Sequence, residues 1–188
     1  MRIRLLSLAL VVVVGATAYT PTSAGAADPT YRPDAWLKLC GQSNGCVIDP
    51  LPHPWRGNNV YNTTGRHQKW KERIDNGEGV RYWVTVQNDG SQKDTFTVQG
   101  CTGNKNFYLN QVVVGFWKDV VGPHTAKHIT YGFKHGTAKF TLGPGKKAGF
   151  TINIITKNPG LKYRCPVTIT SQGDPTKQDK VLPIMVTF

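Results

Sequence analysis

The pentapeptide Gly41-Gln42-Ser43-Asn44-Gly45 has the spacing G-x-S-x-G and is the clearest catalytic motif that the sequence offers. Hydrolases use this spacing to expose a nucleophilic serine on a sharp turn between a strand and a helix of a mixed α/β sheet. Here the motif lies between Cys40 and Cys46 in a chain dominated by strand patterns, so we expect a cysteine-closed turn. Our prediction is that the protein is not an enzyme. A small secreted serine hydrolase using Ser43 is the alternative.

Metal and glycosidase chemistry have weaker support. Imidazoles can bind zinc or copper, and the chain has five histidines: His53, His67, His124, His128 and His135. His124 and His128 have helical spacing, but Gly122-Pro123 precedes them, so we interpret the histidines as exposed loop residues. The carboxylates are scattered, with no pair that spacing alone assigns to glycoside hydrolysis. We therefore expect no metal and no cofactor.

The segment Arg66–Arg73 interleaves basic residues with a tryptophan, and it is the strongest candidate binding site. Cations supply attraction to anionic sugars or phosphates, and an indole supplies a stacking face. The predicted binding residues are Arg66, Lys69, Trp70, Lys71 and Arg73. The alternative is a solvated charge run with Trp70 as a core anchor. Nucleic acid would meet the same chemistry, but we expect an envelope polymer as the natural partner outside the cell.

Aromatic residues suggest a second kind of site. Four further tryptophans, together with seven tyrosines, could form a platform for neutral carbohydrate: Trp36, Trp55, Trp83 and Trp117. Trp83 lies on the strand face opposite Val84 and Val86, which in a two-sheet sandwich points to solvent, to a partner or to a covering loop. A neutral carbohydrate-binding module is therefore a further alternative.

The elements that must position these residues are short strands. From Gly79 to Gln87 apolar and polar residues alternate with period two, and Asn88-Asp89-Gly90 then predicts a tight turn. Similar patterns predict strands at 94–99, 107–109, 111–117, 137–142, 149–156, 165–171 and 182–188. The last strand places Leu182, Ile184, Val186 and Phe188 on one face, and its Pro183 suggests an edge strand or a bulge. A short helix is a candidate at 68–74.

Seven or eight such strands with regular turns indicate an all-β fold, an immunoglobulin-like sandwich of two antiparallel sheets. The glycine- and proline-rich segment 40–57 is expected to be a disulfide-closed loop insertion. Four cysteines allow three pairings, and their spacing favours Cys40 with Cys46 and Cys101 with Cys165. Zinc is the rival use of the four thiols, but paired C-x-x-C motifs are missing.

The first 26 residues have the pattern of a secretory signal peptide. A basic start, Met1–Arg4, precedes an apolar run, Leu5–Val14, which is too short for a membrane span. We place cleavage after Ala26, with Ala18 as an earlier alternative, and we expect 27–188 to form one extracellular domain without a transmembrane segment. That domain has 21 Lys and Arg against 11 Asp and Glu, and the excess attracts polyanions, although charge also serves solubility.

Five turn and strand signatures, taken in their order along the chain, resemble those of bacterial extracellular immunoglobulin-like modules. They are 33–36, 57–62, 84–90, 94–100 and 142–145. Modules of the CARDB type, which act as exported spacer or adhesion repeats, are similar. The resemblance implies a non-catalytic sandwich that links, presents or binds, here to anionic cell-envelope polymers or a protein partner. The single copy, the 40–57 insertion, the cysteines and the basic charge depart from a pure spacer.

Overall fold

The computed structural model describes residues 30–42, 54–75, 77–102, 108–114, 127–155 and 159–188. Its elements in chain order are β1 (Pro33–Gln42), β2 (Lys69–Ile74), β3 (Gly79–Asn88), β4 (Asp94–Gly100), β5 (Tyr108–Val114), β6 (Lys127–His128), α1 (Thr130–His135), β7 (Ala138–Leu142), β8 (Lys147–Ile155), β9 (Lys162–Arg164), β10 (Val167–Ser171) and β11 (Gln178–Thr187). No helix among these residues is long and apolar enough to cross a membrane.

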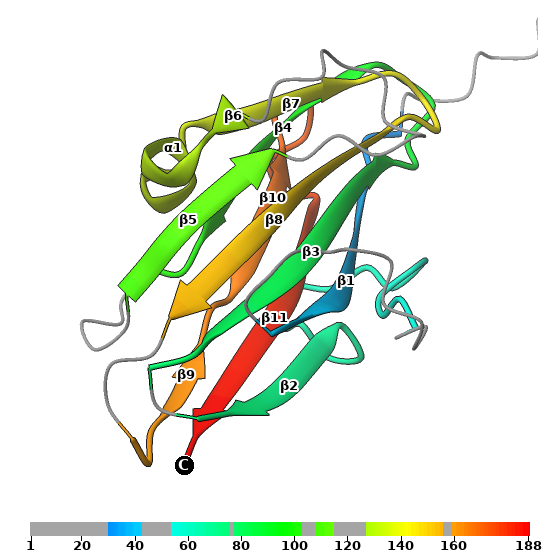
Figure 1. Ribbon diagram of the computed structural model, residues 1–188. Helices are drawn as coiled ribbons and strands as arrows, with labels where there is room; N and C mark the ends of the chain where they lie inside the picture. Colours follow the sequence, from blue (N-terminus) through cyan, green and yellow to red (C-terminus); the bar gives the residue numbers. More distant parts are fainter. Residues whose placement is uncertain (1–29, 43–53, 76, 103–107, 115–126, 156–158) are drawn as a thin grey trace, which may run out of the picture.

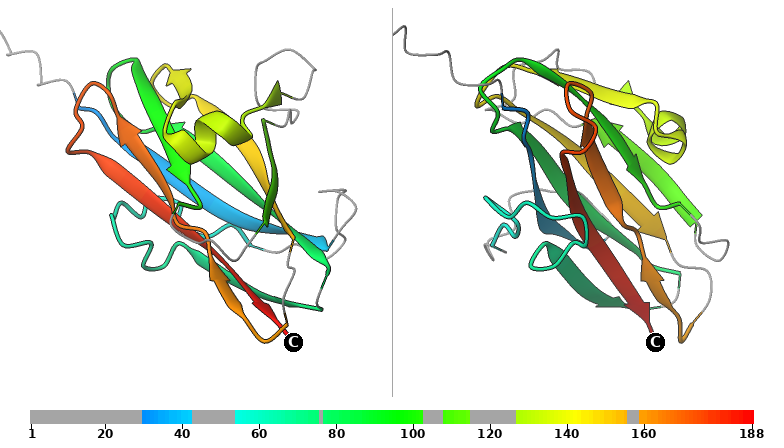
Figure 2. Two further views of the ribbon diagram at one scale, coloured as in Figure 1. Left: turned by 90° about the vertical axis from the view of Figure 1, so that its left-hand side faces the viewer. Right: turned by 180° about the vertical axis from the view of Figure 1, so that it is seen from behind.

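Two sheets pack face to face as a sandwich (Figures 1 and 2). The five-stranded sheet has the order β1-β3-β8-β5-β6, and the six-stranded sheet has the order β2-β11-β10-β4-β7, with β9 also paired to β11. The all-β sandwich prediction is confirmed. Its antiparallel character needs one correction, because β2 and β11 run parallel. A long excursion of the chain separates these two strands, as a parallel pair requires.

The core lies between the sheets and follows the predicted alternation. Val84 in β3, Phe96 in β4 and Ile152 in β8 are fully buried and belong to one apolar cluster. Their neighbours along each strand point outward, so these strands place alternate residues on opposite faces of their sheets. The inner faces supply the hydrophobic stabilisation of the fold.

A disulfide joins Cys101, directly after β4, to Cys165, between β9 and β10, as the spacing predicts. It closes a separation of 64 residues, which constrains the unfolded chain by about 4 kcal/mol. Cys40, in β1, is also disulfide-bonded, and Cys46 lies outside the described residues. A disulfide-bonded chain points to an oxidising compartment.

The prediction of a short helix at 68–74 is wrong, because Lys69–Ile74 forms strand β2. The residues pair in register with β11, from Leu182 opposite Lys69 to Thr187 opposite Ile74. Trp70 and Ile74 are buried while Lys69, Lys71 and Arg73 are exposed, which is a period of two. Pairing with a buried strand overrides the weak helical preference of so short a segment.

The prediction of an edge strand or bulge at Pro183 is also wrong. Strand β11 is interior, with β2 on one side and β9 and β10 on the other. Leu182 N donates to Gln68 O, so the missing amide of Pro183 would point the opposite way, into the interruption between β9 and β10. The proline lies opposite Cys165, in the interruption between β9 and β10, where Cys165 N still donates to Pro183 O at 3.0 Å.

Two further boundaries differ from expectation. Within the described residues, the predicted strands 107–109 and 111–117 are parts of one strand, β5, whose register shifts between Leu109 and Gln111, while residues 107 and 115–117 lie outside the described residues. The predicted insertion 40–57 begins inside β1, which continues to Gln42, and Arg56 near its other end pairs with Leu37. The rest of that insertion lies outside the described residues.

Candidate anion-binding face

Six basic side chains gather on the outer face of the six-stranded sheet, where β2, β11 and β9 lie side by side. They are Lys69, Lys71, Arg73, Lys162, Arg164 and Lys180, and we call them the basic face. Figure 2 shows these strands from behind in its right-hand view. The outward positions of β2, β9, β10 and β11 are all described, and none of them is acidic. The face therefore concentrates positive charge without an internal counter-charge.

The strand register sets the spacing of the cations. Ile184 in β11 lies between Lys71 of β2 and Arg164 of β9. One step further along, Val186 lies between Arg73 and Lys162. Neighbouring strands are about 4.8 Å apart, so the two basic columns are about 10 Å apart at the backbone. An extended anionic chain could contact both columns at once.

An apolar column runs between the two basic columns. Leu182, Ile184, Val186 and Phe188 share one face, as the sequence predicts, and this is the outer face. The core side of β11 is formed instead by residues such as Val181 and Met185, both fully buried. Ile184 is 6% exposed although it points outward, which fits cover by the aliphatic stems of neighbouring basic residues. The face thus combines charge with apolar surface.

Trp70 is separated from the cations with which it was grouped. It points to the core side of β2, is 8% exposed, and belongs to the core cluster. The guanidinium of Arg56 lies 4.3 Å from the centre of its ring and also donates to Lys69 O at 3.2 Å. These contacts give the indole the core-anchoring role that was the alternative. Arg66 is exposed in the loop before β2.

Buried hydrogen bonds hold the start of β2 against β11. Asp179 is fully buried, and its carboxylate accepts from Ala35 N at 2.7 Å, Gln68 Nε2 at 2.8 Å and Asn62 N at 3.1 Å. Gln68 Nε2 also donates to Ala35 O at 3.0 Å. This network joins β1, the loop 57–68 and β11, and it positions the residues that precede the basic column of β2.

Burial dominates the electrostatics of that network. It raises the pKa of Asp179 from 3.8 to about 6, although the N–H donors around the carboxylate act in the opposite direction. Burial likewise raises the pKa of Asp34, whose carboxylate accepts from Trp36 Nε1 and Asn59 N. Both acids lie away from the outer positions that carry the basic face.

The tryptophans predicted as a sugar platform form a different arrangement on the outer face of the five-stranded sheet. Trp55 packs edge-on against Trp36 at 6.0 Å and against Trp83 at 6.1 Å. Trp83 is 7% exposed, and Lys147 Nζ lies 4.1 Å from the centre of the Trp36 ring. Edge-on rings that pack on one another stabilise the segment around Trp55 more than they present flat stacking surfaces. Trp117 lies outside the described residues.

The described residues give no support to the candidate catalytic serine or to a metal site built from the histidines. Ser43, His53 and His124 lie outside them, and Gly41 and Gln42 end strand β1. His67, His128 and His135 are exposed. No group of three or more His, Cys, Asp and Glu among the described residues could hold a metal ion.

Half of the basic face was missed from the sequence. Lys162, Arg164 and Lys180 are about a hundred residues from β2 along the chain, and strand pairing brings the two parts together. Two local signals could have pointed to them. Lys162 and Arg164 alternate with buried Tyr163, and the run 181–186 is apolar on both faces, which indicates a strand covered on both sides.

Comparison of the chain with known proteins gives matches among solved structures. No family model matches the sequence, and no curated protein does. One similar solved structure is a family 123 glycoside hydrolase from Clostridium perfringens, at 13% identity and a TM-score of 0.43 over 64% of this chain. The chain spans 23% of that protein's length. Another is PapD-like domain 7 of human CEP192, at 10% identity and a TM-score of 0.35, covering 64% of this chain and 79% of that one.

Proposed function

We propose that this protein is a secreted, non-catalytic binding module that holds a polyanionic partner of the cell envelope on its basic face. The observation that carries the proposal is the convergence of six cations from three strands on one surface without an acidic residue among the outward positions. Such a surface attracts anions at a distance of about one Debye length, roughly 8 Å at physiological ionic strength. The resemblance to exported bacterial modules and the disulfide agree with an extracellular setting.

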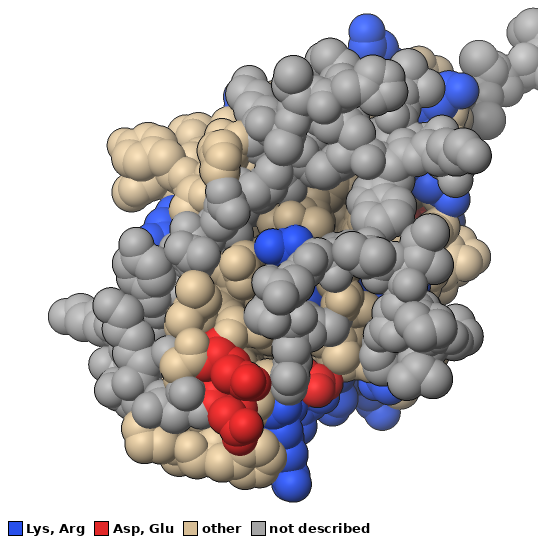
Figure 3. Space-filling view, viewed as in Figure 1, with Lys and Arg blue, Asp and Glu red and all other residues tan. Residues whose placement is uncertain are grey.

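The acidic side chains of the described residues leave this surface open to anions. Glu72 points to the inner side of β2, and Asp75 and Glu78 lie in the turn that follows it. Figure 3 shows acidic side chains on the side of the five-stranded sheet, with basic side chains projecting at the lower edge beneath them. Among the described outward positions of these strands, no acidic side chain competes with an anion for the basic face.

A heparin column tests the proposal with matched variants. The face variant carries Lys69→Gln, Lys71→Gln and Lys162→Gln, three exposed lysines of the basic face. The control carries Lys93→Gln, Lys134→Gln and Lys146→Gln, three exposed lysines in α1 and in the turns at the opposite end of the sandwich (Figure 1). Both variants lose the same net charge and the same residue type.

Each cation that binds heparin releases a counterion, so the affinity of the parent for heparin should fall steeply as the salt concentration rises. We expect the face variant to elute at clearly lower salt than the control, and its slope of log affinity against log salt to fall by about two to three. Equal elution of the two variants would show that binding reflects diffuse charge and would refute a specific face. Failure of the parent to bind at low salt would refute the proposal as a whole.

A further inference from the structure

A pocket of about 600 Å³ opens at the end of the sandwich where β1 begins and where the turn between β10 and β11 lies. One wall is formed by residues 30–33 with Tyr61, and the other by residues of the segment 174–178. Figure 2 shows the start of β1 beside this turn in both views. The volume is within the range of pockets that hold small molecules. None of the lining residues belongs to the basic face, so the pocket is a separate candidate site.

Backbone hydrogen bonds fix the wall that precedes β1. Ser91 N donates to Thr30 O at 3.0 Å, and Asp89 N donates to Arg32 O at 2.9 Å. A Cβ at Gly90 would lie 2.2 Å from Thr30 O, so this close approach of the two backbones requires a glycine in the turn. The start of the described chain is thus held against the turn that follows β3.

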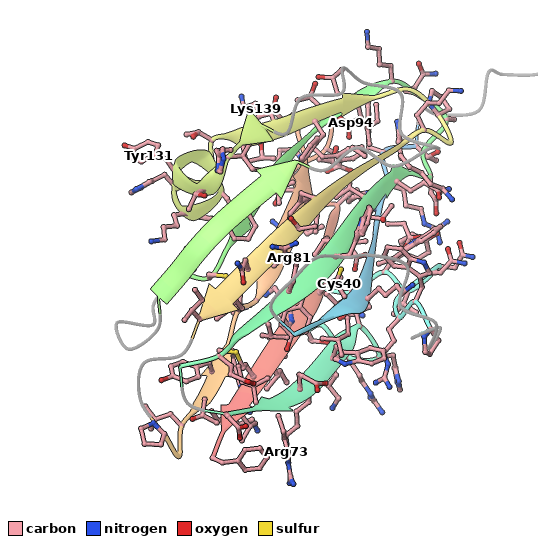
Figure 4. The ribbon with its side chains drawn as sticks, viewed as in Figure 1. Cys40, Arg73, Arg81, Asp94, Tyr131 and Lys139 are labelled. Atoms are coloured by element: carbon pink, nitrogen blue, oxygen red, sulfur yellow. A yellow bond between two sulfur atoms is a disulfide. The ribbon has the colours of Figure 1, made fainter. Side chains whose placement is uncertain are left out.

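Hydrogen bonds around the turn between β10 and β11 fix the opposite wall. Gly173 N donates to Asp94 Oδ1 at 3.1 Å, and Asp174 N donates to Ser171 Oγ at 2.9 Å. Figure 4 shows Asp94 at this end of the sandwich. A Cβ at Gly173 would lie 2.3 Å from a carbon of the Tyr31 ring, so the ring packs directly on the backbone of the turn. Both walls are therefore preformed, which lowers the entropic cost of binding a ligand.

The lining combines aromatic rings with an excess of positive charge. Tyr31 and Tyr61 are half-buried. Arg32 and Lys177 are exposed cations, and among the described residues that line the pocket Asp174 is the one acid. Two cations against one carboxylate favour a ligand that carries one negative charge.

The guanidinium of Arg32 is positioned to bind a carboxylate. Its carbon lies 3.5 Å from the centre of the Tyr61 ring, and Tyr61 Oη donates to Asp89 Oδ2 at 2.5 Å, which fixes the ring beneath the guanidinium. Stacking engages the flat face of the guanidinium, and its N–H donors lie in the plane, where a carboxylate can accept two of them. The carboxylate of Asp174 instead accepts from Thr176 N at 3.0 Å and Thr176 Oγ1 at 2.6 Å, within its own turn.

We propose that this pocket binds an acidic sugar, a ring with several hydroxyl groups and one carboxylate, of which a hexuronate is the simplest. The sugar carboxylate pairs with Arg32 and Lys177. Its hydroxyl groups meet the side chains of Thr176 and Gln178, which line the same pocket. The apolar C–H face of the sugar packs on Tyr31, since Arg32 covers a face of the other tyrosine. A neutral sugar leaves the two cations without a partner.

Calorimetric titration of the protein with glucuronate tests the inference. Glucose has a similar ring without charge, and glucose 6-phosphate adds a doubly charged group. We expect glucose to bind at least about tenfold more weakly than glucuronate, because it lacks the charge-assisted hydrogen bonds. Equal affinity for glucose would overturn the role of the cations, and tighter binding of glucose 6-phosphate would overturn the assignment to a carboxylate.

Matched variants locate the binding. The pocket variant carries Arg32→Gln with Lys177→Gln, and the control carries Arg73→Gln with Lys162→Gln, which removes the same residue types from the basic face. All four side chains are exposed, and Figure 4 shows Arg73 at the end of the sandwich opposite Asp94. The pocket variant should lose at least about tenfold in glucuronate affinity and the control should match the parent. Equal affinities of the two variants would overturn the pocket, and thermal unfolding checks that both fold.

Tyr31 gives a readout that is independent of charge. Tyr31→Phe keeps the ring and should bind glucuronate like the parent, whereas Tyr31→Ala should lose roughly fivefold. Unchanged affinity of Tyr31→Ala would overturn the placement of the sugar against this ring.

A free uronate and a uronate at the end of a polysaccharide share the recognised chemistry. Titration of the Arg73 and Lys162 control with galacturonate and with trigalacturonate distinguishes these sources, since tighter binding of the trimer identifies a polysaccharide. The site is independent of the basic face. Absence of uronate binding in the parent would therefore overturn this inference and leave the proposed function, which is measured on heparin, standing.

Discussion

Asp179 makes the stability of the fold depend on pH in a direction that can be measured. Its carboxyl is fully buried, and burial raises its pKa in the folded protein from 3.8 to about 6. Between these two pH values the folded state binds a proton that the unfolded state has released. Unfolding therefore becomes easier as pH rises from about 4 to about 6. A pKa difference of about 2 corresponds to about 3 kcal/mol of unfolding free energy.

The substitution Asp179→Asn isolates this effect, because the amide does not titrate. We would measure urea unfolding of the parent and the variant by tryptophan fluorescence at about pH 4, 5, 6 and 7. The variant loses part of the acceptor set for Ala35 N, Gln68 Nε2 and Asn62 N, which adds a pH-independent cost. The unfolding free energy of the parent minus that of the variant should fall by about 3 kcal/mol over this range, mostly below pH 6.

Asp174→Asn serves as a control of opposite sign. Hydrogen bonds from Thr176 Oγ1 at 2.6 Å and Thr176 N at 3.0 Å lower the pKa of Asp174, so the stability of the parent relative to this variant should rise with pH. If the Asp179 difference also rises with pH, the N–H donors outweigh burial and the reasoning is refuted. A flat difference would mean that the two opposing effects cancel.

Three further outcomes follow from the packing. Replacing Cys101 and Cys165 with Ala should lower the unfolding free energy by about 4 kcal/mol, measured in urea, and an unchanged midpoint would mean that the unfolded chain is compact without the bridge. Gly57→Ala should lower the melting temperature by several degrees, because Gly57 has φ of 109° and an added Cβ would lie 2.7 Å from a backbone oxygen of β1. Ile152→Ala should cost about 2–5 kcal/mol and the outward, half-buried Thr168→Ala less than about 1, and similar costs would contradict the assigned faces.

The strands that the sequence predicts well are those whose outward residues are polar. In β3 and β8 the inward positions are apolar and most outward ones are polar or small, so a period of two is visible without any tertiary information. Strand β1 was missed because its outward residues include Trp36 and Cys40, which hide the alternation of Ala35, Leu37 and Leu39. Apolar outward residues arise where something covers the face, and that cover is encoded elsewhere in the chain.

The candidate site was predictable in part for the same reason. Lys69, Lys71 and Arg73 stand out as a local run of charge, and the structure places all three on one face. Their partners on β9 and β11 could not be found by inspecting the run, because the parallel pairing of β2 with β11 depends on long-range register. The grouping of Trp70 with the cations followed from treating the segment as a loop, whereas in a strand adjacent residues point to opposite faces.

The register of β11 also explains why stability and binding should be coupled in this protein. A slip of one residue would turn Ile184 and Val186 to the core and Met185 to solvent, and the apolar column between the cations would be lost. Two hydrogen bonds adjoin Pro183 and specify the register: Leu182 N donates to Gln68 O at 2.8 Å, and Cys165 N donates to Pro183 O at 3.0 Å. Gln68, the acceptor of the first bond, is held by its side-chain hydrogen bond to Asp179. Cys165, the donor of the second bond, is joined to Cys101 by the disulfide. The buried carboxylate and the disulfide therefore stabilise the strand positions on which the basic face depends, although neither group lies on that face.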